Sequence, residues 1–278
     1  MTIFIFTLLI LLGSLLAGLV GSLTGLGGGV VIIPMLTLLF GVDIHYAIGA
    51  SLVAVIATSS GSAAAYVKEG ISNIRVGMFL EIATTIGAVV GAAVAVYAPT
   101  HFIAILFGIV LIISAILSLK KRNTTTISKS QGKLGTWFKL NGTYPTADGT
   151  VAYDVVRVPA GFLMMIIAGA ISGLLGIGSG ALKVIAMDNI MKLPFKVSTT
   201  TSNFMIGVTA TASAGVYFQR GYIDPGLCFP VVLGVLAGAM GGAKFLIIGQ
   251  TSWLRIFFAI VIGFLAIQMI YNGITGKL

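Results

Sequence analysis

The stretch "LVGSLTGLGGGVVIIPM" at residues 19–35 returns in altered form as "AISGLLGIGSGALKVIA" at residues 170–186. Both copies interrupt an apolar segment with a cluster of glycines at the same place. Glycine lets the backbone take a positive φ angle and lets another group approach it closely, so each cluster is predicted to break a helix. The sequence therefore predicts two matched interruptions, one in each half of the chain.

The composition is that of a polytopic membrane protein. Of the 278 residues, 58% are hydrophobic and 8% are charged, whereas soluble domains carry about 25% charged residues. The mean hydropathy is +1.11, and several apolar runs exceed the ~18 residues of a candidate membrane helix. The first apolar segment lacks a basic flank and a small-residue cleavage site, so we expect a retained helix rather than a removed signal peptide.

Several classes of protein are excluded by what the chain lacks. Its one cysteine, Cys228, rules out a disulfide framework and a thiolate metal cluster. His45 and His101 have no metal-ligand partners at suitable spacing, and no metal or other cofactor is expected. The net charge of +9 is interpreted as basic residues gathered in cytoplasmic loops rather than as a nucleic-acid surface. No HExxH motif and no set of nucleophile, base and orienting group is found, so an enzyme is not expected.

A shift of 151 residues (170 minus 19) aligns the two halves of the chain without a gap. The matched positions are glycines, hydroxyl residues and a tyrosine: Gly25 and Gly176, Gly27 and Gly178, Gly29 and Gly180, Ser51 and Ser202, Thr58 and Thr209, Tyr66 and Tyr217, Gly70 and Gly221, Gly87 and Gly238. We predict an all-α fold with two homologous membrane repeats, at residues 1–119 and 158–278. Each repeat is expected to hold about four full transmembrane helices and one short helix broken by glycine, which is an architecture typical of transporters.

A polar linker at residues 120–157 separates the repeats. It holds seven of the sixteen Lys and Arg residues and directly follows a membrane segment, so we expect it to be cytoplasmic. Within it, "KLNGTY", "PTADG" and "TVAYDVVRV" have the pattern of strand, turn and strand, which predicts a small β-hairpin on the membrane surface.

The relative orientation of the repeats depends on whether the short segments cross the membrane. Five crossings per half make the repeats inverted, and with the linker inside they place these basic residues inside: Lys68, Arg75, Lys192, Lys196 and Arg255, against Arg220 and Lys277 outside. Four crossings make the repeats parallel and give a less asymmetric distribution: Lys68, Arg75, Arg220 and Lys277 inside, against Lys192, Lys196 and Arg255 outside. The rule that positive residues stay inside therefore favours inverted repeats.

The segments after the glycines, 29–41 and 181–193, would be about 20 Å long as helices, too short for a hydrocarbon core of about 30 Å. Broken backbone is tolerated at that depth only where protein covers it or where it lines a wet cavity. The start of each short helix would then direct free N–H groups and a positive dipole end at a cavity, which favours an anion. The alternative is that the glycines only allow close helix packing, the role expected of Gly234, Gly238 and Gly242.

Other residues nearby are also suited to an anion. Lys183 lies in the second short segment, and a buried cation there is costly unless it has a partner; snorkelling is the alternative. The run "STTTSN" at 198–203 supplies hydroxyl and amide donors, although capping and bonds between helices are the alternative for each hydroxyl. The candidate substrate-binding residues are Gly27, Gly28, Gly29, Ser51, Gly178, Ser179, Gly180, Lys183, Thr200, Thr201, Ser202 and Asn203.

Two acidic residues inside apolar segments are candidates for coupling transport to an ion. Glu81 is either a proton-coupling carboxylate or an interfacial residue near the start of its segment. Asp188 is the second candidate, although it is better spaced to pair with Lys192, at i+4, than with Lys183.

Nearly the whole chain resembles the sulfite exporter TauE/SafE family, also called the toluene sulfonate uptake permeases. The resemblance rests on "GLGGGVVIIP", "GIGSGALKV", "KVSTTTSNFMIGVTATASAGVYFQRGYIDP" (196–225) and "YDVVRVPAG" (153–161). It implies secondary transport of small sulfur-containing or organic anions, such as sulfite, sulfonates and sulfoacetate, in a prokaryotic inner membrane. Two positions depart from the pattern: Ser179 stands where the family commonly has glycine, and Ile185 is the counterpart of Pro34.

The expected function is therefore alternating access around a midplane site between the two glycine breaks. The expected partners are a small anionic substrate, the lipid bilayer and a coupling ion, H⁺ or Na⁺, and a homo-oligomer is left open. An anion channel and a membrane assembly protein that transports nothing are the alternatives. The channel would use the same helix ends without alternating gates, whereas the assembly protein would leave Lys183 and the paired breaks unexplained.

Overall fold

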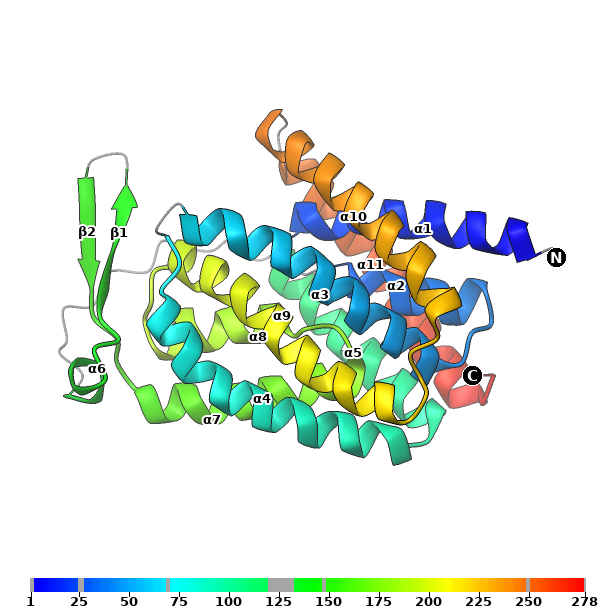
Figure 1. Cartoon of the computed structure of the whole chain (residues 1–278), viewed down its shortest axis with the longest axis horizontal. Coiled ribbons are helices and arrows are strands. Elements are labelled where there is room, and N and C mark those ends of the chain that lie inside the picture. Colours follow the sequence, from blue (N-terminus) through cyan, green and yellow to red (C-terminus); the bar gives the residue numbers. More distant parts are fainter. Residues whose placement is uncertain are drawn as a thin grey trace.

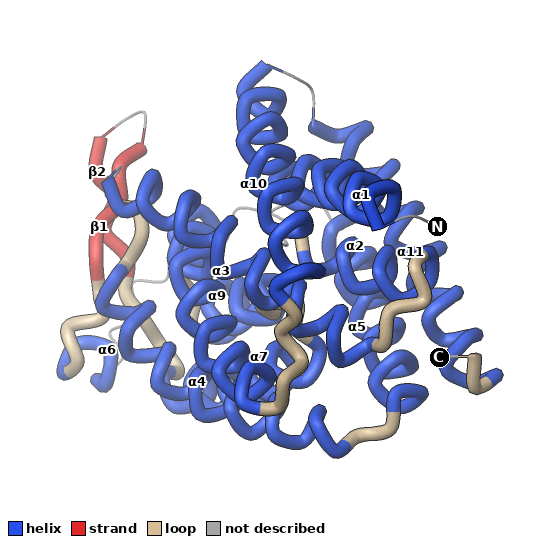
Figure 2. The backbone as a smooth tube through the Cα atoms, turned by 45° about the vertical axis from the view of Figure 1, so that its right-hand side comes forward, coloured by secondary structure: helices blue, strands red, loops and turns tan. Residues whose placement is uncertain are grey.

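A computed structural model of the chain describes residues 3–24, 28–68, 71–119, 133–146, 149–248 and 251–277. Long helices pack side by side into one bundle, and a β-hairpin stands at one end of it (Figure 1). Both chain ends lie away from that hairpin in either view (Figures 1 and 2). Gly25, Gly27, Gly70 and most of the basic part of the linker, at 120–132, lie outside the described residues.

The two repeats contain the same succession of elements. The first has α1 (Ile3–Thr24), α2 (Gly29–Pro34), the π-helix η1 (Met35–Leu39), α3 (Ile44–Lys68), α4 (Ile74–Tyr97) and α5 (Thr100–Leu119). The second has α7 (Val158–Leu175), α8 (Gly180–Ile185), the π-helix η2 (Ala186–Ile190), α9 (Phe195–Gln219), α10 (Pro225–Ile248) and α11 (Thr251–Thr275). Each long helix and each short segment expected from the sequence therefore has a counterpart here.

Both short segments change from α-helix to π-helix after their sixth residue. α2 passes into η1 at Met35, and α8 passes into η2 at Ala186. Pro34 ends α2, but the corresponding residue of α8 is Ile185, so the proline alone does not cause the change. Single π-turns inside α-helices are frequent at functional sites.

The linker contains α6 (Lys133–Trp137) and the antiparallel strands β1 (Gly142–Thr146) and β2 (Gly149–Tyr153). Pro145 lies within β1, where the sequence pattern predicts a turn. A two-stranded sheet has only edge strands, and an edge strand tolerates a residue without an N–H group. The side-chain nitrogen of Asn73, which caps α4, donates to Leu140 O and to the Tyr153 hydroxyl, both at 2.8 Å. The hairpin is thus fixed to the end of the bundle where α4 begins.

α1 packs along α10, and α4 packs along α7. The two pairs are equivalent, because α1 corresponds to α7 and α4 to α10 in the repeat. Glycines make both approaches possible. A Cβ atom at Gly91 would overlap the carbonyl oxygen of Ala170, and one at Gly173 would overlap that of Ala88. At the other crossing, Gly234 and Gly238 lie against the backbone of Leu11 and Leu15. The packing role expected of these two α10 glycines is confirmed, whereas Gly242 has no described side-chain environment.

The outside of the bundle is apolar. On α4 alone, exposed positions include Met78, Ile82, Ile86, Val90 and Val94. Among the described helices, α4 and α7 are long and apolar enough to cross a membrane by themselves, and further apolar helical stretches are shorter. A belt of exposed aliphatic side chains around a bundle with buried hydroxyl and charged groups is typical of a protein whose solvent is lipid.

Candidate functional site

The two glycine breaks meet at one turn of α3. The Ser51 hydroxyl donates to Gly176 O, in the second break, at 2.9 Å. On its other side, a Cβ atom at Gly29 would lie 2.5 Å from Ser51 Oγ and 3.2 Å from Gly176 O. One turn further on, Val55 lies between the positions of Gly29 and Gly178. The start of α2 and the second break are therefore held together in the protein interior.

The second break has an unusual backbone. Gly176, Gly178 and Ser179 all have positive φ angles, of 66°, 71° and 42°. Glycine takes such angles freely, but serine does so only at a cost, because its Cβ crowds the following carbonyl. In the first break Gly28 is helical, with a φ of −65°, so the two breaks are not the same. The hydroxyl of Ser179 is buried and has no hydrogen-bond partner among the described residues.

Ile206 of α9 closes the second break from one side. Its side chain would lie 2.8 Å from a Cβ atom at Gly178 and 2.7 Å from one at Gly180. Ser202, one turn earlier on α9, donates to Gly180 O at 3.2 Å. Ser202 is the counterpart of Ser51, and both serines therefore bond to backbone of the second break. In this conformation the break is packed and no open space adjoins it on that face.

Lys183 is fully buried and points along α9. Its Nζ donates to Thr209 Oγ1 at 2.6 Å and to Met205 O at 3.3 Å. Thr209 Oγ1 in turn lies 2.6 Å from Glu81 Oε1. Glu81 is 7% exposed and stands within α4, and its coupling or interfacial role stays a prediction. The chain Lys183, Thr209, Glu81 links three helices through one hydroxyl.

The hydroxyl run at 198–203 does not converge on one point. Thr199 and Thr200 donate to backbone carbonyls one turn back in α9. Thr201 Oγ1 accepts from Asn73 N at 3.0 Å, at the start of α4. Asn203 is half-buried. Because successive residues of a helix point about 100° apart, only Ser202 of this run reaches the second break.

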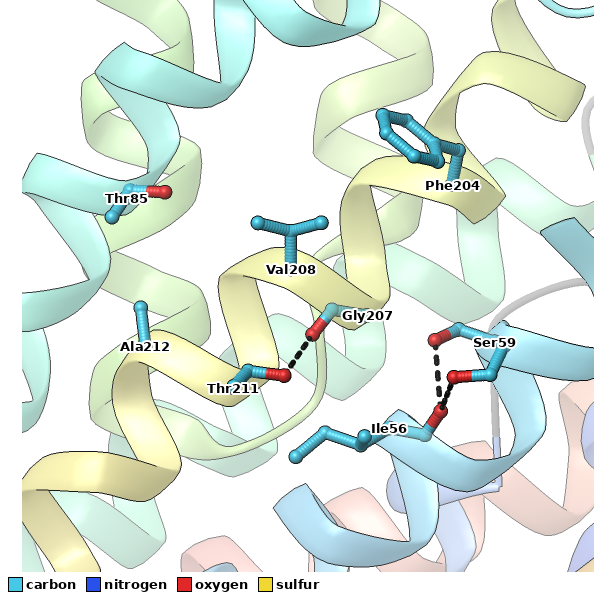
Figure 3. A pocket seen from close by; sticks show the side chains of 9 residues that line it. Ile56, Ser59, Thr85, Phe204, Gly207, Val208, Thr211 and Ala212 are labelled. Carbon is cyan, nitrogen blue, oxygen red and sulfur yellow. Dashed lines mark hydrogen bonds between the residues drawn. The ribbon is translucent and has the colours of Figure 1, made fainter.

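A cavity of about 610 Å³ opens between α3, α4 and α9 (Figure 3). Its polar lining consists of hydroxyls: Ser59, Ser60, Thr85 and Thr211. Thr85 faces it from α4, across from Val208 and Ala212 on α9 (Figure 3). No described candidate residue lines this cavity. Thr85 nevertheless connects it to the buried chain, since its hydroxyl lies 3.4 Å from Glu81 Oε1.

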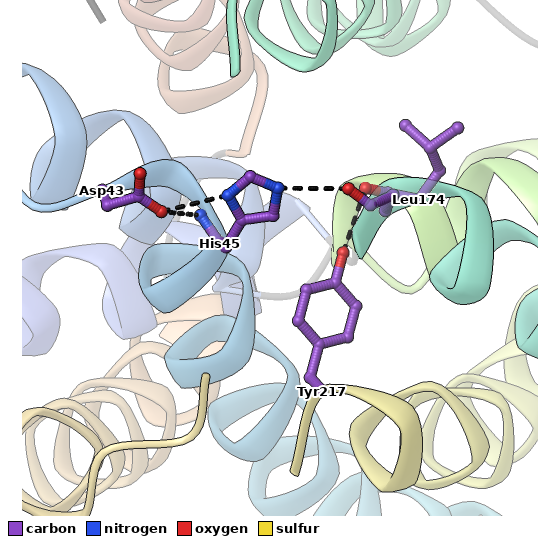
Figure 4. A network of polar contacts seen from close by, with 5 residues as sticks. Asp43, His45, Leu174 and Tyr217 are labelled. Atoms are coloured by element: carbon purple, nitrogen blue, oxygen red, sulfur yellow. Dashed lines mark hydrogen bonds and ion pairs between the residues drawn. The ribbon is translucent and has the colours of Figure 1, made fainter. Parts of the chain in front are cut away.

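A second polar network lies where α3 begins and where α4 and α7 end (Figure 4). His45 Nδ1 is 3.1 Å from Asp43 Oδ1, and Nε2 is 3.1 Å from Ala95 O. Hydrogen bonding from the His45 side chain lowers the pKa of the Asp43 carboxyl, which lies in the loop before α3. The Tyr217 hydroxyl donates to Leu174 O at 3.4 Å, near the end of α7. These contacts tie the beginning of α3 to the end of α4, and α9 to the end of α7.

Two residues of this region, Thr209 and Thr85, are missing from the candidate residues predicted from the sequence. Thr209 was visible only as the counterpart of Thr58 in the repeat alignment, and that position carries no charge by which to recognise it. Thr85 corresponds to Leu236 in the repeat alignment, so the alignment did not indicate it. Gly27, by contrast, was expected and lies outside the described residues, while Asp188 is buried in η2.

Comparison with known proteins agrees with this architecture. The family model "Sulfite exporter TauE/SafE" matches residues 10–269. The chain is similar to the "Probable membrane transporter protein YunE" of Bacillus subtilis, with 31% identity over 276 residues, 97% of this chain and 98% of the relative. It is also similar to YdhB of Bacillus subtilis, with 30% identity over 86% of this chain and 89% of the relative. The "Probable membrane transporter protein MJ0441" of Methanocaldococcus jannaschii is 26% identical over 95% and 94%.

No solved structure matches the chain. The family model and the relatives agree on an integral membrane protein of a transporter family, not an enzyme family, with relatives in bacteria and an archaeon. The chain belongs to the sulfite exporter TauE/SafE family of membrane transporters.

Proposed function

We propose that this protein is a secondary transporter of small sulfur-containing or organic anions, of the sulfite, sulfonate or sulfoacetate class. It works by alternating access around a site between the two glycine breaks. The observation that carries the proposal is the meeting of both breaks at Ser51, together with a fully buried lysine, Lys183, three residues after Gly180 in α8. A buried cation next to broken backbone is costly in a membrane unless a function retains it.

The anion site is built from groups around the second break. Ser179 offers a buried hydroxyl with no partner among the described residues. The short helix that follows offers backbone N–H groups at its start. Lys183 supplies the positive charge, one turn beyond Gly180. Gly28, Gly29, Ser51 and Ser202 complete the surroundings, whereas Thr200 and Thr201 bond to other parts of the protein.

Access to this site requires a change of conformation. Ile206 packs against Gly178 and Gly180, and a bound anion needs that space. Movement of α9 relative to α8 would open the break, and movement of the equivalent helices of the first repeat would open it on the other side. Two similar halves that exchange conformations are the usual structural basis of alternating access.

Inverted repeats fit the arrangement of the helix ends. Val156 N donates to Met191 O at 3.1 Å, so the second short segment returns to the side where α7 began. Thr201 and Asn73 meet at that same side, together with the hairpin. Arg220 bonds to Tyr97 at the opposite side. Arg75, Lys192 and Lys196 thus share the hairpin side, as five crossings per repeat require, and we assign that side to the cytoplasm.

A thermal-shift screen of the detergent-purified protein is the first test. Sulfite, sulfate, thiosulfate, sulfoacetate, taurine and simple carboxylates are compared, because a ligand that binds only the folded state raises its apparent stability. We expect selective stabilisation by one class of sulfur anion, and we expect Lys183→Ala to abolish it. Lys196→Ala, which removes an exposed lysine at the start of α9, is the matched control and should respond like the unaltered protein.

Transport in proteoliposomes then separates the mechanisms. A carrier should accumulate the stabilising anion against its gradient when a proton or sodium gradient is applied. Current that reverses at the anion's Nernst potential, without dependence on either ion, would instead identify a channel. If Lys183→Ala left both rate and affinity unchanged, the proposed site would be wrong.

A further inference from the structure

Lys183, Thr209 and Glu81 form a buried network of hydrogen bonds. A lysine ammonium can only donate hydrogen bonds, and an ionised carboxylate can only accept them. The Thr209 hydroxyl therefore accepts from Lys183 Nζ at 2.6 Å, and its own proton lies within hydrogen-bond distance of Glu81 Oε1, at 2.6 Å, and of Met205 O, at 2.8 Å. Lys183 and Glu81, both buried, are thereby connected through one intervening side chain.

Glu81 is the charged partner that faces Lys183 in the described interior. α7, which packs along α4, carries no titratable side chain between Val158 and Leu175. The titratable groups of α9, Lys196 and Tyr217, lie more than two turns from Thr209 along that helix, and Asp188 lies in η2, five residues beyond Lys183. A buried cation without its counterion is strongly unfavourable. The ionised carboxylate therefore holds the lysine in its present position.

The two oxygen atoms of the Glu81 carboxyl group have different surroundings. Oε2 is buried and has no hydrogen-bond partner among the described residues. The other oxygen also receives the Thr85 hydroxyl, at 3.4 Å. Because Thr85 lines the cavity between α3, α4 and α9, the carboxyl group lies one side chain away from a space large enough for water. The Glu81 carboxyl group is thus connected to the cavity through its Oε1 atom and the Thr85 hydroxyl.

We propose that Glu81 is the proton-binding site that couples anion transport, by competing with the anion for Lys183. When Glu81 is ionised, it holds Lys183 through Thr209 and the lysine does not serve the anion. When a proton binds the Glu81 carboxyl group, the group becomes neutral, and Lys183 becomes available to the anion. One proton and one anion then bind together, so the protein is a proton–anion symporter.

This inference rests on the proposed function, because it concerns the same lysine. The coupling is reciprocal: if protonation of Glu81 raises the affinity for the anion, binding of the anion must raise the affinity of Glu81 for the proton by the same factor. Anion affinity should therefore fall as the pH rises through the range in which Glu81 loses its proton, by up to about tenfold per pH unit. The proton should be taken up from solution when the anion binds.

The test measures the Kd of two anions by titration of the whole, purified protein. Ethanesulfonate and sulfoacetate are used because their charge stays constant from about pH 6 to 8, so that pH acts on the protein alone. For the unaltered chain we expect Kd to rise with pH and about one proton to be taken up per anion at the alkaline end. Glu81→Gln, which mimics the protonated carboxyl group, should bind with the tight Kd at every pH and take up no proton.

Further variants distinguish coupling from a structural role. Glu81→Asp keeps the titrating group and should keep a pH dependence, which also covers the case in which Glu81→Gln fails to fold. Asp224→Asn removes an exposed carboxylate in the loop before α10 and should behave like the unaltered protein. Thr209→Ser should retain the pH dependence, because a hydroxyl still joins the two charges.

Three outcomes would overturn the inference. A Kd that does not change with pH in the unaltered protein would exclude proton coupling, and so would an unchanged pH dependence in Glu81→Gln. In both cases anion binding itself would survive, and the proposed function with it. Failure of both anions to bind at every pH, in folded protein, would overturn this inference together with the anion site on which it rests.

Discussion

The residue Ser179 has two structural features that its sequence neighbours do not combine. It has a left-handed backbone, with φ at 42°, and a buried hydroxyl without a described partner. Both features cost free energy in the empty protein. A residue that is kept in spite of such costs is expected to contribute to binding.

Ser179→Gly should therefore raise the stability of the protein and weaken its binding of the anion. Glycine removes the left-handed strain, which is worth about 1–2 kcal/mol, so the melting temperature in detergent should rise while the affinity for the stabilising anion falls. Ser172→Gly is the control, since Ser172 is also buried without a described partner but stands inside α7. There glycine should destabilise by about 1 kcal/mol. A Ser179→Gly protein with unchanged anion affinity would remove this hydroxyl from the site.

Thr209 and Thr58 occupy matching positions in the two repeats but have different partners. Both lie within hydrogen-bond distance of the carbonyl one turn back in their own helix, Met205 O and Ala54 O, but Thr209 also joins Lys183 to Glu81. Valine has nearly the same shape as threonine. Thr209→Val should lower the free energy of unfolding by about 1–3 kcal/mol, because it leaves buried charged groups short of a partner. Thr58→Val should cost clearly less in chemical denaturation, and equal losses would contradict this difference.

Elements in the bundle are positioned by glycines at their crossings. α4 and α7 approach so closely that Gly91 and Gly173 each meet a backbone carbonyl of the other helix, and α1 and α10 are related in the same way through Gly234 and Gly238. In lipid, where apolar burial gives no advantage to helix association, such close packing is the main attraction between helices. The two crossings therefore hold the repeats together.

Gly91→Ala should separate α4 from α7. The added methyl group would overlap Ala170 O, which is backbone and cannot turn away, so a loss of about 1–3 kcal/mol is expected. Gly215 of α9 is the matched control, because a Cβ atom there meets nothing within 4 Å. Gly215→Ala should be neutral or slightly stabilising, since alanine favours helix by up to about 1 kcal/mol. Thermal denaturation in detergent compares the two, and equal melting temperatures would refute the crossing model.

The whole molecule has two distinct ends. The hairpin, the start of α4 and the start of α9 share one end through Asn73 and Thr201. The start of α3, the end of α4 and the end of α9 share the other, through His45 and Arg220. If the bundle crosses a membrane along this axis, the two ends face opposite compartments.

Cysteine labelling tests this topology, because Cys228 is the one cysteine of the chain. In a Cys228→Ser background, Trp137→Cys places a thiol at the hairpin end, at a position that is 74% exposed. Gln219→Cys places one at the exposed end of α9. An impermeant maleimide added to intact cells should label position 219 and not 137, and both should react in inside-out or permeabilised membranes. Labelling of both positions from outside would contradict opposite ends.

The sequence by itself determined the membrane class, the repeated order of elements and the presence of a short, glycine-broken helix in each half. These features depend on composition, on segment length and on local backbone preference, all of which can be read along the chain. The contrast between Ser179, with a positive φ, and its helical counterpart Gly28 was not predictable, because it depends on what packs against each break.

Only the tertiary structure decided which polar groups meet. The hydroxyls at 198–203 appeared as one donor cluster in sequence, yet a helix directs them around its axis, so Thr201 reaches α4 while Ser202 reaches the second break. Glu81 and Lys183, 102 positions apart (183 minus 81), are joined by a threonine from a third helix. Such a pairing follows from the packing of α4, α8 and α9, which is a property of long-range contacts and not of any segment alone.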